Sequence, residues 1–141
     1  MQPTHSLTPP LKHLRLSGIL ETLEVRHRQA IDEQWSHVQF LERLLQDEVE
    51  RRGQKQLTLR LRRAAFQAGK TLERFDFSFN PQLNRQQIMD LATGQFIERK
   101  EPVLLCGPSG VGKSHLAQAL GHSACCRGYD VIFISTARML Q

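Results

Sequence analysis

Residues 107–114 read Gly-Pro-Ser-Gly-Val-Gly-Lys-Ser, and this stretch decides what kind of fold the sequence builds. The spacing G-x-x-x-x-G-K-[ST] is that of the phosphate-binding P-loop. Its glycines lack a Cβ, so the backbone can curl until several N–H groups point at one anion. Lys113 should reach the β- and γ-phosphates of ATP, and the Ser114 hydroxyl should ligate Mg²⁺. The expected nucleotide site comprises Gly107, Pro108, Ser109, Gly110, Val111, Gly112, Lys113 and Ser114.

The sequence on either side of the loop supplies the elements that the motif needs. Residues 103–106 are a short apolar run, typical of a buried parallel strand. Residues 113–127 carry apolar side chains at helical spacing, and Gly128 stands where a glycine ends a helix. Residues 131–134 form a second apolar run. Strand, loop, helix and strand together predict one βαβ unit of an α/β fold.

The first half of the chain predicts helices instead. Thr8 followed by two prolines indicates a helix start, and leucines and isoleucines from 11 to 23 form a helical stripe. Ser36 and Gln39 fit a capping box that begins a second helix, which we expect Gly53 to break. Residues 55–68 then predict a third helix.

The segment between the two halves has its own pattern. Phe75, Phe77 and Phe79 alternate with polar residues, which indicates an extended segment with one buried face. Asn84 is positioned to cap a short helix that ends at Gly94.

A basic stretch at residues 51–74 holds eight Lys and Arg against a single acid, Glu73. Such a density suits contact with the phosphates of duplex DNA, for which Arg60, Arg62 and Arg63 are the candidates. Two alternatives remain open. The stretch could be a solvated helix face, or it could pair with the acids at positions 42–50.

Composition narrows the classes of function. The 141-residue chain has a net charge of +5, which suits an acidic partner. Its three cysteines fit neither a disulfide framework nor a zinc site, and its six histidines lack metal-ligand spacing. No apolar run is long enough for a membrane span, and the first residues lack the features of a signal peptide. We therefore expect no membrane partner and a cytoplasmic protein.

One element that an ATPase requires has no counterpart in the sequence. Hydrolysis uses an acidic residue, at the end of an apolar strand beyond the P-loop, that holds Mg²⁺ and positions water. No apolar strand ending in Asp-Glu follows residue 114. The sequence therefore predicts nucleotide binding, no catalytic residue and no multiple turnover, and whether the chain is an enzyme stays open.

Five stretches in register carry a resemblance to a known family. They are Leu11-Lys-His-Leu-Arg-Leu-Ser-Gly, Phe40-Leu-Glu-Arg-Leu-Leu, Lys70-Thr-Leu-Glu-Arg-Phe-Asp-Phe, Leu91-Ala-Thr-Gly with Phe96-Ile-Glu-Arg, and Leu104-Leu-Cys-Gly-Pro-Ser-Gly-Val-Gly-Lys-Ser-His-Leu-Ala. Across nearly the whole chain, the sequence resembles the IstB-like transposition helper ATPases. These are AAA+ proteins of bacterial insertion sequences, related to the DnaC-type helicase loaders.

The resemblance implies a division of the chain and a function. It implies a helical, basic amino-terminal domain (1–69), a lead-in to the nucleotide pocket (70–101), and the start of an AAA+ domain (102–141). We expect the chain to be an amino-terminal fragment, because the family's later motifs are missing. The implied function is an ATP- and Mg²⁺-binding helper that forms homo-oligomers on duplex DNA and assists a transposase. Alternatives are a DnaC-like helicase-loader adaptor or an inactive truncated product.

Overall fold

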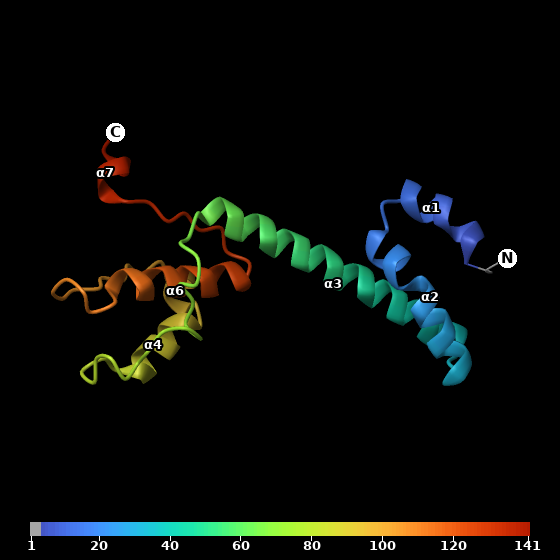
Figure 1. Ribbon diagram of the computed structural model, residues 1–141, viewed down its shortest axis with the longest axis horizontal. Coiled ribbons are helices and arrows are strands. Elements are labelled where there is room, and N and C mark those ends of the chain that lie inside the picture. Colours follow the sequence, from blue (N-terminus) through green and yellow to red (C-terminus); the bar gives the residue numbers. More distant parts are fainter. Residues whose placement is uncertain (1–3) are drawn as a thin grey trace. The chain divides into compact units, whose positions relative to one another are not determined.

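The computed structural model describes residues 4–141, and these divide into two compact units with the boundary between Gln56 and Leu57. Figure 1 shows the helices of both. In chain order the elements are a 3₁₀ turn η1 (His5–Leu7), α1 (Thr8–His13), α2 (Ser17–Asp32), α3 (His37–Ala64), α4 (Arg85–Ala92), α5 (Gln95–Glu98), α6 (Lys113–Cys126) and α7 (Thr136–Met139). Helix α3 continues through the boundary between the units. The three-part division expected from the resemblance stays a prediction.

The apolar stripe expected as one helix from residue 11 to 23 is divided between α1 and α2. Pro9 and Pro10 occupy the first turn of α1, as the sequence predicted. The chain then leaves helical geometry at Arg15, whose φ of 57° is left-handed. The first unit's core consists of Ile19, Leu23 and Leu44, with Leu11, Leu16 and Phe40 packed against it. Because the helix is interrupted, apolar side chains of both α1 and α2 pack on the same core, which one straight helix would not allow.

Helix α3 begins with the predicted capping box and continues past the predicted break. The Ser36 N–H donates to Gln39 Oε1 (2.8 Å), and the Gln39 N–H donates to Ser36 Oγ (3.2 Å). The expectation that Gly53 ends this helix was wrong, since α3 runs from His37 to Ala64. A single glycine costs only about 1 kcal/mol relative to alanine, which the helical residues on both sides outweigh.

Two acidic side chains of α3 hold α2 against it. Glu48 Oε2 accepts hydrogen bonds from the N–H groups of Gly18 (2.7 Å) and Ile19 (3.1 Å), at the first turn of α2. Asp47 accepts from Thr22 Oγ1 and, through both carboxylate oxygens, from Arg26. A Cβ on Gly18 would lie 2.8 Å from the Glu48 Cα, so the two backbones meet closely there. We call Gly18, Asp47 and Glu48 the helix latch.

The second unit is built around α4 and α6, which lie side by side (Figure 1). Its core contains Ile88, Leu116 and Leu120, with the partly buried hydrophobic side chains around them including Phe75 and Leu105. The predicted cap of α4 is confirmed, because Asn84 Oδ1 accepts from the Gln87 N–H (3.2 Å). Helix α6 ends at Cys126, and Gly128, just beyond its C-cap Arg127, has the left-handed conformation expected of a glycine after a helix, with a φ of 99°.

The predicted βαβ unit is not seen, because the structure contains no strand among residues 4–141. Residues 103–106 and 131–134 lie outside any helix or ladder, and Leu104 and Ile132 are 85% and 72% exposed. A strand needs a neighbour that pairs its N–H and C=O groups. The Phe133 N–H instead donates to the Ala64 carbonyl at the end of α3 (2.9 Å). The fold described here is therefore helical, with the α/β part of the expectation unmet.

The phenylalanine segment forms turns rather than the extended segment that we expected. The Phe79 N–H donates to the Asp76 carbonyl (3.3 Å), and the Asp76 carboxylate accepts from the Ser78 N–H (2.9 Å). The chain therefore reverses at Asp76, a type of turn that aspartate favours. Phe75 and Phe77 stack edge to face at 4.9 Å, whereas Phe79 is 69% exposed.

Candidate functional site: a P-loop at the start of α6

The P-loop occupies the connection that leads directly into α6. Gly110 and Gly112 have φ values of 81° and 90°, a left-handed conformation that side chains disfavour, and Gly112 is the N-cap residue of α6. The helix begins at Lys113, as the motif requires. Its N-terminal N–H groups and its dipole favour an anion at this position.

The Lys113 side chain folds back toward the loop. Its Nζ donates hydrogen bonds to the carbonyl oxygens of Gly107 and Pro108, the latter at 2.6 Å. The ammonium group therefore lies within the curl of the loop, where the motif needs a positive charge. No acid competes for it, because the ion pairs of the described residues do not include Lys113.

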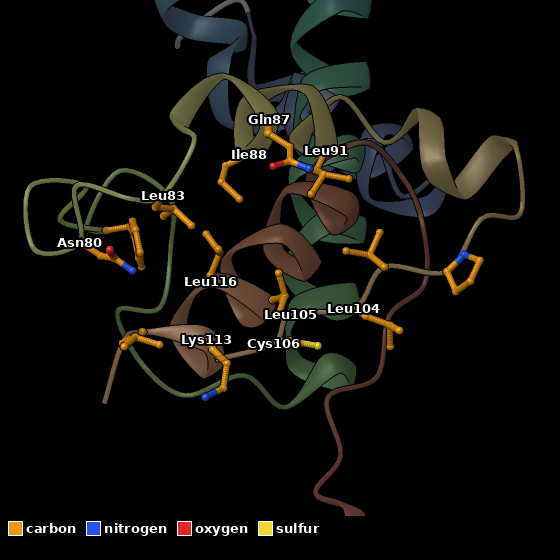
Figure 2. A pocket seen from close by; sticks show the side chains of 15 residues that line it. Asn80, Leu83, Gln87, Ile88, Leu91, Leu104, Leu105, Cys106, Lys113 and Leu116 are labelled. Carbon is orange, nitrogen blue, oxygen red and sulfur yellow. The ribbon is translucent and has the colours of Figure 1, made fainter. Parts of the chain in front are cut away.

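A cavity of about 420 Å³ lies beside the loop (Figure 2). Side chains reach it from α4, from the start of α6, and from residues 102–106. Gly112 and Lys113 line it together with apolar residues that include Leu83, Ile88 and Leu116, and the polar groups of Asn80 and Gln87. A cavity lined by apolar side chains together with polar groups suits the flat base of a nucleotide, which has apolar faces and polar edges.

A second cavity of about 460 Å³ opens on the loop itself, and we call it the phosphate cavity. It is lined by Lys70, Ser109, Gly110, Gly112, Lys113, Ser114 and His115. The lining contains two lysines and a histidine but no carboxylate, so its electrostatics favour an anion. The loop residues Gly107, Pro108 and Val111, also expected at the site, are not part of this lining.

Sequence reasoning missed the role of a buried glutamine one turn into α6. Gln118 is fully buried, and its Nε2 lies 3.3 Å from both the carbonyl oxygen and the Oγ of Ser114. Its Oε1 accepts from the Gln67 N–H (2.8 Å). Gln118 thus joins the hydroxyl expected to ligate Mg²⁺ to the segment that follows α3. Its polar side chain on the apolar face of α6 was the one available signal.

A metal site formed by protein side chains alone is not present in the described part of the chain. No group of three or more His, Cys, Asp or Glu is close enough to hold a metal ion. Ser114 by itself suits a Mg²⁺ ion that takes most of its ligands from phosphates and water, which is the usual arrangement for this ion.

The three arginines proposed for DNA contact differ in the contacts that their side chains make. Arg60 Nε donates to the Cys125 carbonyl near the end of α6 (3.2 Å), so it holds two helices together. Arg63 lies 3.9 Å from Asp130, with both side chains largely exposed. Arg62 is exposed, and among the described residues it has neither a hydrogen bond nor an ion pair. The acids of α3 do pair in part with this stretch, since Arg52 contacts Glu48.

The loop, its helix and the anion-favouring cavity define the class of the protein, a P-loop protein with a candidate nucleotide site. A family model described as IstB-like ATP binding protein matches residues 9–141, so the chain belongs to the IstB-like family. No helix of the described residues is long and apolar enough to cross a membrane.

Individual relatives agree with this assignment. A "putative ATP-binding protein" in an insertion sequence of Mycobacterium tuberculosis is 47% identical over 96% of this chain and 54% of its own length. An insertion sequence IS21 "putative ATP-binding protein" of Pseudomonas aeruginosa is 38% identical, with 96% and 51% covered. A counterpart from insertion sequence IS232 of Bacillus thuringiensis subsp. berliner is 34% identical, with 96% and 54% covered. The chain thus spans about half the length of these relatives.

Proposed function

We propose that this chain binds Mg·ATP through Gly107–Ser114 and belongs to the machinery that moves an insertion sequence. The observation that carries the proposal is the P-loop, which leads into α6 with Lys113 curled inside it. Family membership and the names of the relatives support ATP as the ligand.

Each part of the nucleotide has a counterpart among these residues. Backbone N–H groups of the loop and of the first turn of α6 would hold the phosphates, with Lys113 neutralising their charge. Ser114 would ligate Mg²⁺, with Gln118 Nε2 fixing the orientation of its hydroxyl group. The cavity between Phe75, Ile88 and Leu116 would take the base.

Nucleotide binding is tested with the substitution Lys113→Ala. Loss of a charged hydrogen-bond partner should weaken binding of a fluorescent ATP analogue about 10-fold or more. Lys55→Ala removes the same charge from an exposed position on α3 and serves as the matched control. Equal affinities of Lys113→Ala and Lys55→Ala would contradict the proposal.

We further propose that the nucleotide-bound protein acts on duplex DNA as a helper of a transposase. The insertion-sequence relatives support this, and they favour it over a DnaC-like helicase loader. The test is co-purification with the transposase encoded in the same insertion sequence, in the presence of ATP, and separately with the replicative helicase. Binding to the helicase and not to the transposase would favour the alternative.

A further inference from the structure

Residues 67–75 run along the first two turns of α6 and are attached to it at three points. We call this segment the strap. At one end, the Gln67 N–H donates to Gln118 Oε1 (2.8 Å). Farther along, the Thr71 carbonyl lies 3.0 Å from His115 Nε2. At the other end, the Phe75 ring meets the His115 ring edge to face at 5.1 Å.

The strap also contacts the P-loop itself. A Cβ on Gly112 would lie 3.1 Å from the Phe75 ring, so the aromatic side chain packs directly on the loop backbone. The strap is therefore attached to α6 on both sides of Lys70, by Gln67 before it and by Thr71 after it. The Phe75 contact with Gly112 then fixes the strap against the loop.

Lys70 lies between these attachments in the chain and lines the phosphate cavity together with Lys113 and other residues of the loop and of α6. Among the described residues it has no hydrogen bond and no ion pair, although it is only partly exposed. Lys70 and Lys113 line one cavity whose lining contains no acid, so the two positive charges together favour a bound anion.

We propose that Lys70 is a second phosphate-binding lysine of the nucleotide site, contacting the polyphosphate together with Lys113 from the lining of the same cavity. The inference rests on the proposed function, because it assigns the ligand of the same site. Its ligand class is a nucleoside di- or triphosphate, with the contact made to the phosphates and not to the nucleoside. Sequence alone had placed Lys70 in the basic stretch expected to bind DNA.

The experiment measures competition by inorganic tripolyphosphate and by ATP against a fluorescent ADP analogue. The variants are Lys70→Gln and Lys70→Arg, with Lys55→Gln as the control for loss of one positive charge and Lys113→Ala as the reference. Lys70→Gln should weaken ATP and tripolyphosphate by the same factor, about 5- to 20-fold, the value for a charged hydrogen bond in a partly exposed site. Lys70→Arg should stay within about 3-fold of the wild type, because it keeps the charge.

The outcomes separate the two proposals. If Lys113→Ala loses affinity while Lys70→Gln binds like Lys55→Gln, the role of Lys70 is overturned and the nucleotide site stands. If Lys70→Gln weakens ATP but not tripolyphosphate, its effect is on the strap and not on the phosphates, and the inference also fails. If the wild type binds neither ATP nor tripolyphosphate, both the proposed function and the role of Lys70 fail.

Discussion

The two units of this protein place their charged side chains in opposite ways. The first unit buries Asp47 and Glu48, and all four carboxylate oxygens of these two residues accept hydrogen bonds. The second unit leaves Lys70 and Lys113 beside a cavity without an acid. Buried charges are costly unless they are paired, so the first arrangement holds helices together. The second arrangement leaves positive charge available to a ligand.

The pKa values of the latch carboxylates reflect this pairing. The hydrogen bond from Arg26 outweighs burial and holds the pKa of Asp47 below its ordinary value. Burial raises the pKa of Glu48, but hydrogen bonds from the Ile19 N–H, from Arg52 and from the Gly18 N–H outweigh it and leave the pKa lowered. Both groups are therefore more acidic in the folded unit than in the unfolded chain.

The largest effect is expected where the latch allows no extra atom. Gly18→Ala places a methyl group 2.8 Å from the Glu48 Cα and 2.9 Å from the Asp47 carbonyl oxygen. We expect a loss of about 1–3 kcal/mol of unfolding free energy, as for other overpacked sites. Gly53→Ala is the control, because nothing lies within 4 Å of that position, and it should gain about 0.5–1 kcal/mol. Urea unfolding followed by far-UV circular dichroism checks both, and a shift of both midpoints in one direction would contradict the latch.

The next effect concerns the carboxylate that caps α2. Glu48→Gln keeps the shape but loses the charge that two backbone N–H groups and Arg52 share. The unfolding free energy should fall by about 1–3 kcal/mol, the cost of poorly satisfied buried donors. Glu50→Gln changes the same atom at an exposed position and should leave the urea midpoint unchanged. Comparable losses of unfolding free energy in the two variants would show that the buried contacts of Glu48 do not stabilise the unit.

Acid should weaken the first unit through the same groups. Because the folded pKa values of Asp47 and Glu48 are lowered, their contribution is complete above the unfolded value of about 4 and is lost as pH falls through the folded values. Thermal unfolding between pH 6 and pH 2 measures this. Asp47→Asn should give a shallower decline below about pH 4, since one of the linked protons is removed. If stability declines with falling pH in Asp47→Asn as it does in the wild type, protonation of Asp47 does not contribute to acid unfolding.

The smallest expected effect distinguishes arginines of the basic stretch. Arg62→Ala should reduce the slope of log K against log salt for duplex DNA by about 0.9, the value for one phosphate contact. Arg60 donates to the Cys125 carbonyl, so Arg60→Ala should lower thermal stability and leave the slope unchanged. Fluorescence anisotropy at several salt concentrations tests this. The same slope for Arg62→Ala and wild type would assign Arg62 to the solvated face.

Features that depend on a few consecutive residues could be predicted from the sequence. The capping box at Ser36 and Gln39, the Asn84 cap and the left-handed Gly128 just beyond α6 are formed as expected. Each uses hydrogen bonds within a few positions along the chain, so its partners are present whenever the local residues are. The P-loop belongs here too, because its glycines and the following helix suffice to shape it.

Features that depend on distant partners were predicted poorly. The runs at 103–106 and 131–134 are apolar enough for strands, but strand pairing needs a neighbour that local sequence cannot provide. Gly53 was expected to end a helix because the low helix propensity of glycine can be recognised in the sequence. The length of α3, which compensates for that cost, cannot be recognised in the same way. The phenylalanine alternation failed for a local reason instead, because Asp76 forms a turn with Ser78 and Phe79.

The sequence by itself determined that this protein has a glycine-rich loop with the P-loop motif at the start of a helix, and the family match rests on residues across nearly the whole chain. Only the tertiary structure showed what surrounds Gly18, Lys70 and Gln118. The close approach of α3 to Gly18 is a contact between residues far apart in the chain, which the structure alone shows. The strap along α6 gives Gln118 its hydrogen bond with Gln67 and brings Lys70 to the lining of the phosphate cavity. Contacts between residues 30 and 51 positions apart are set by packing, and no local pattern encodes them.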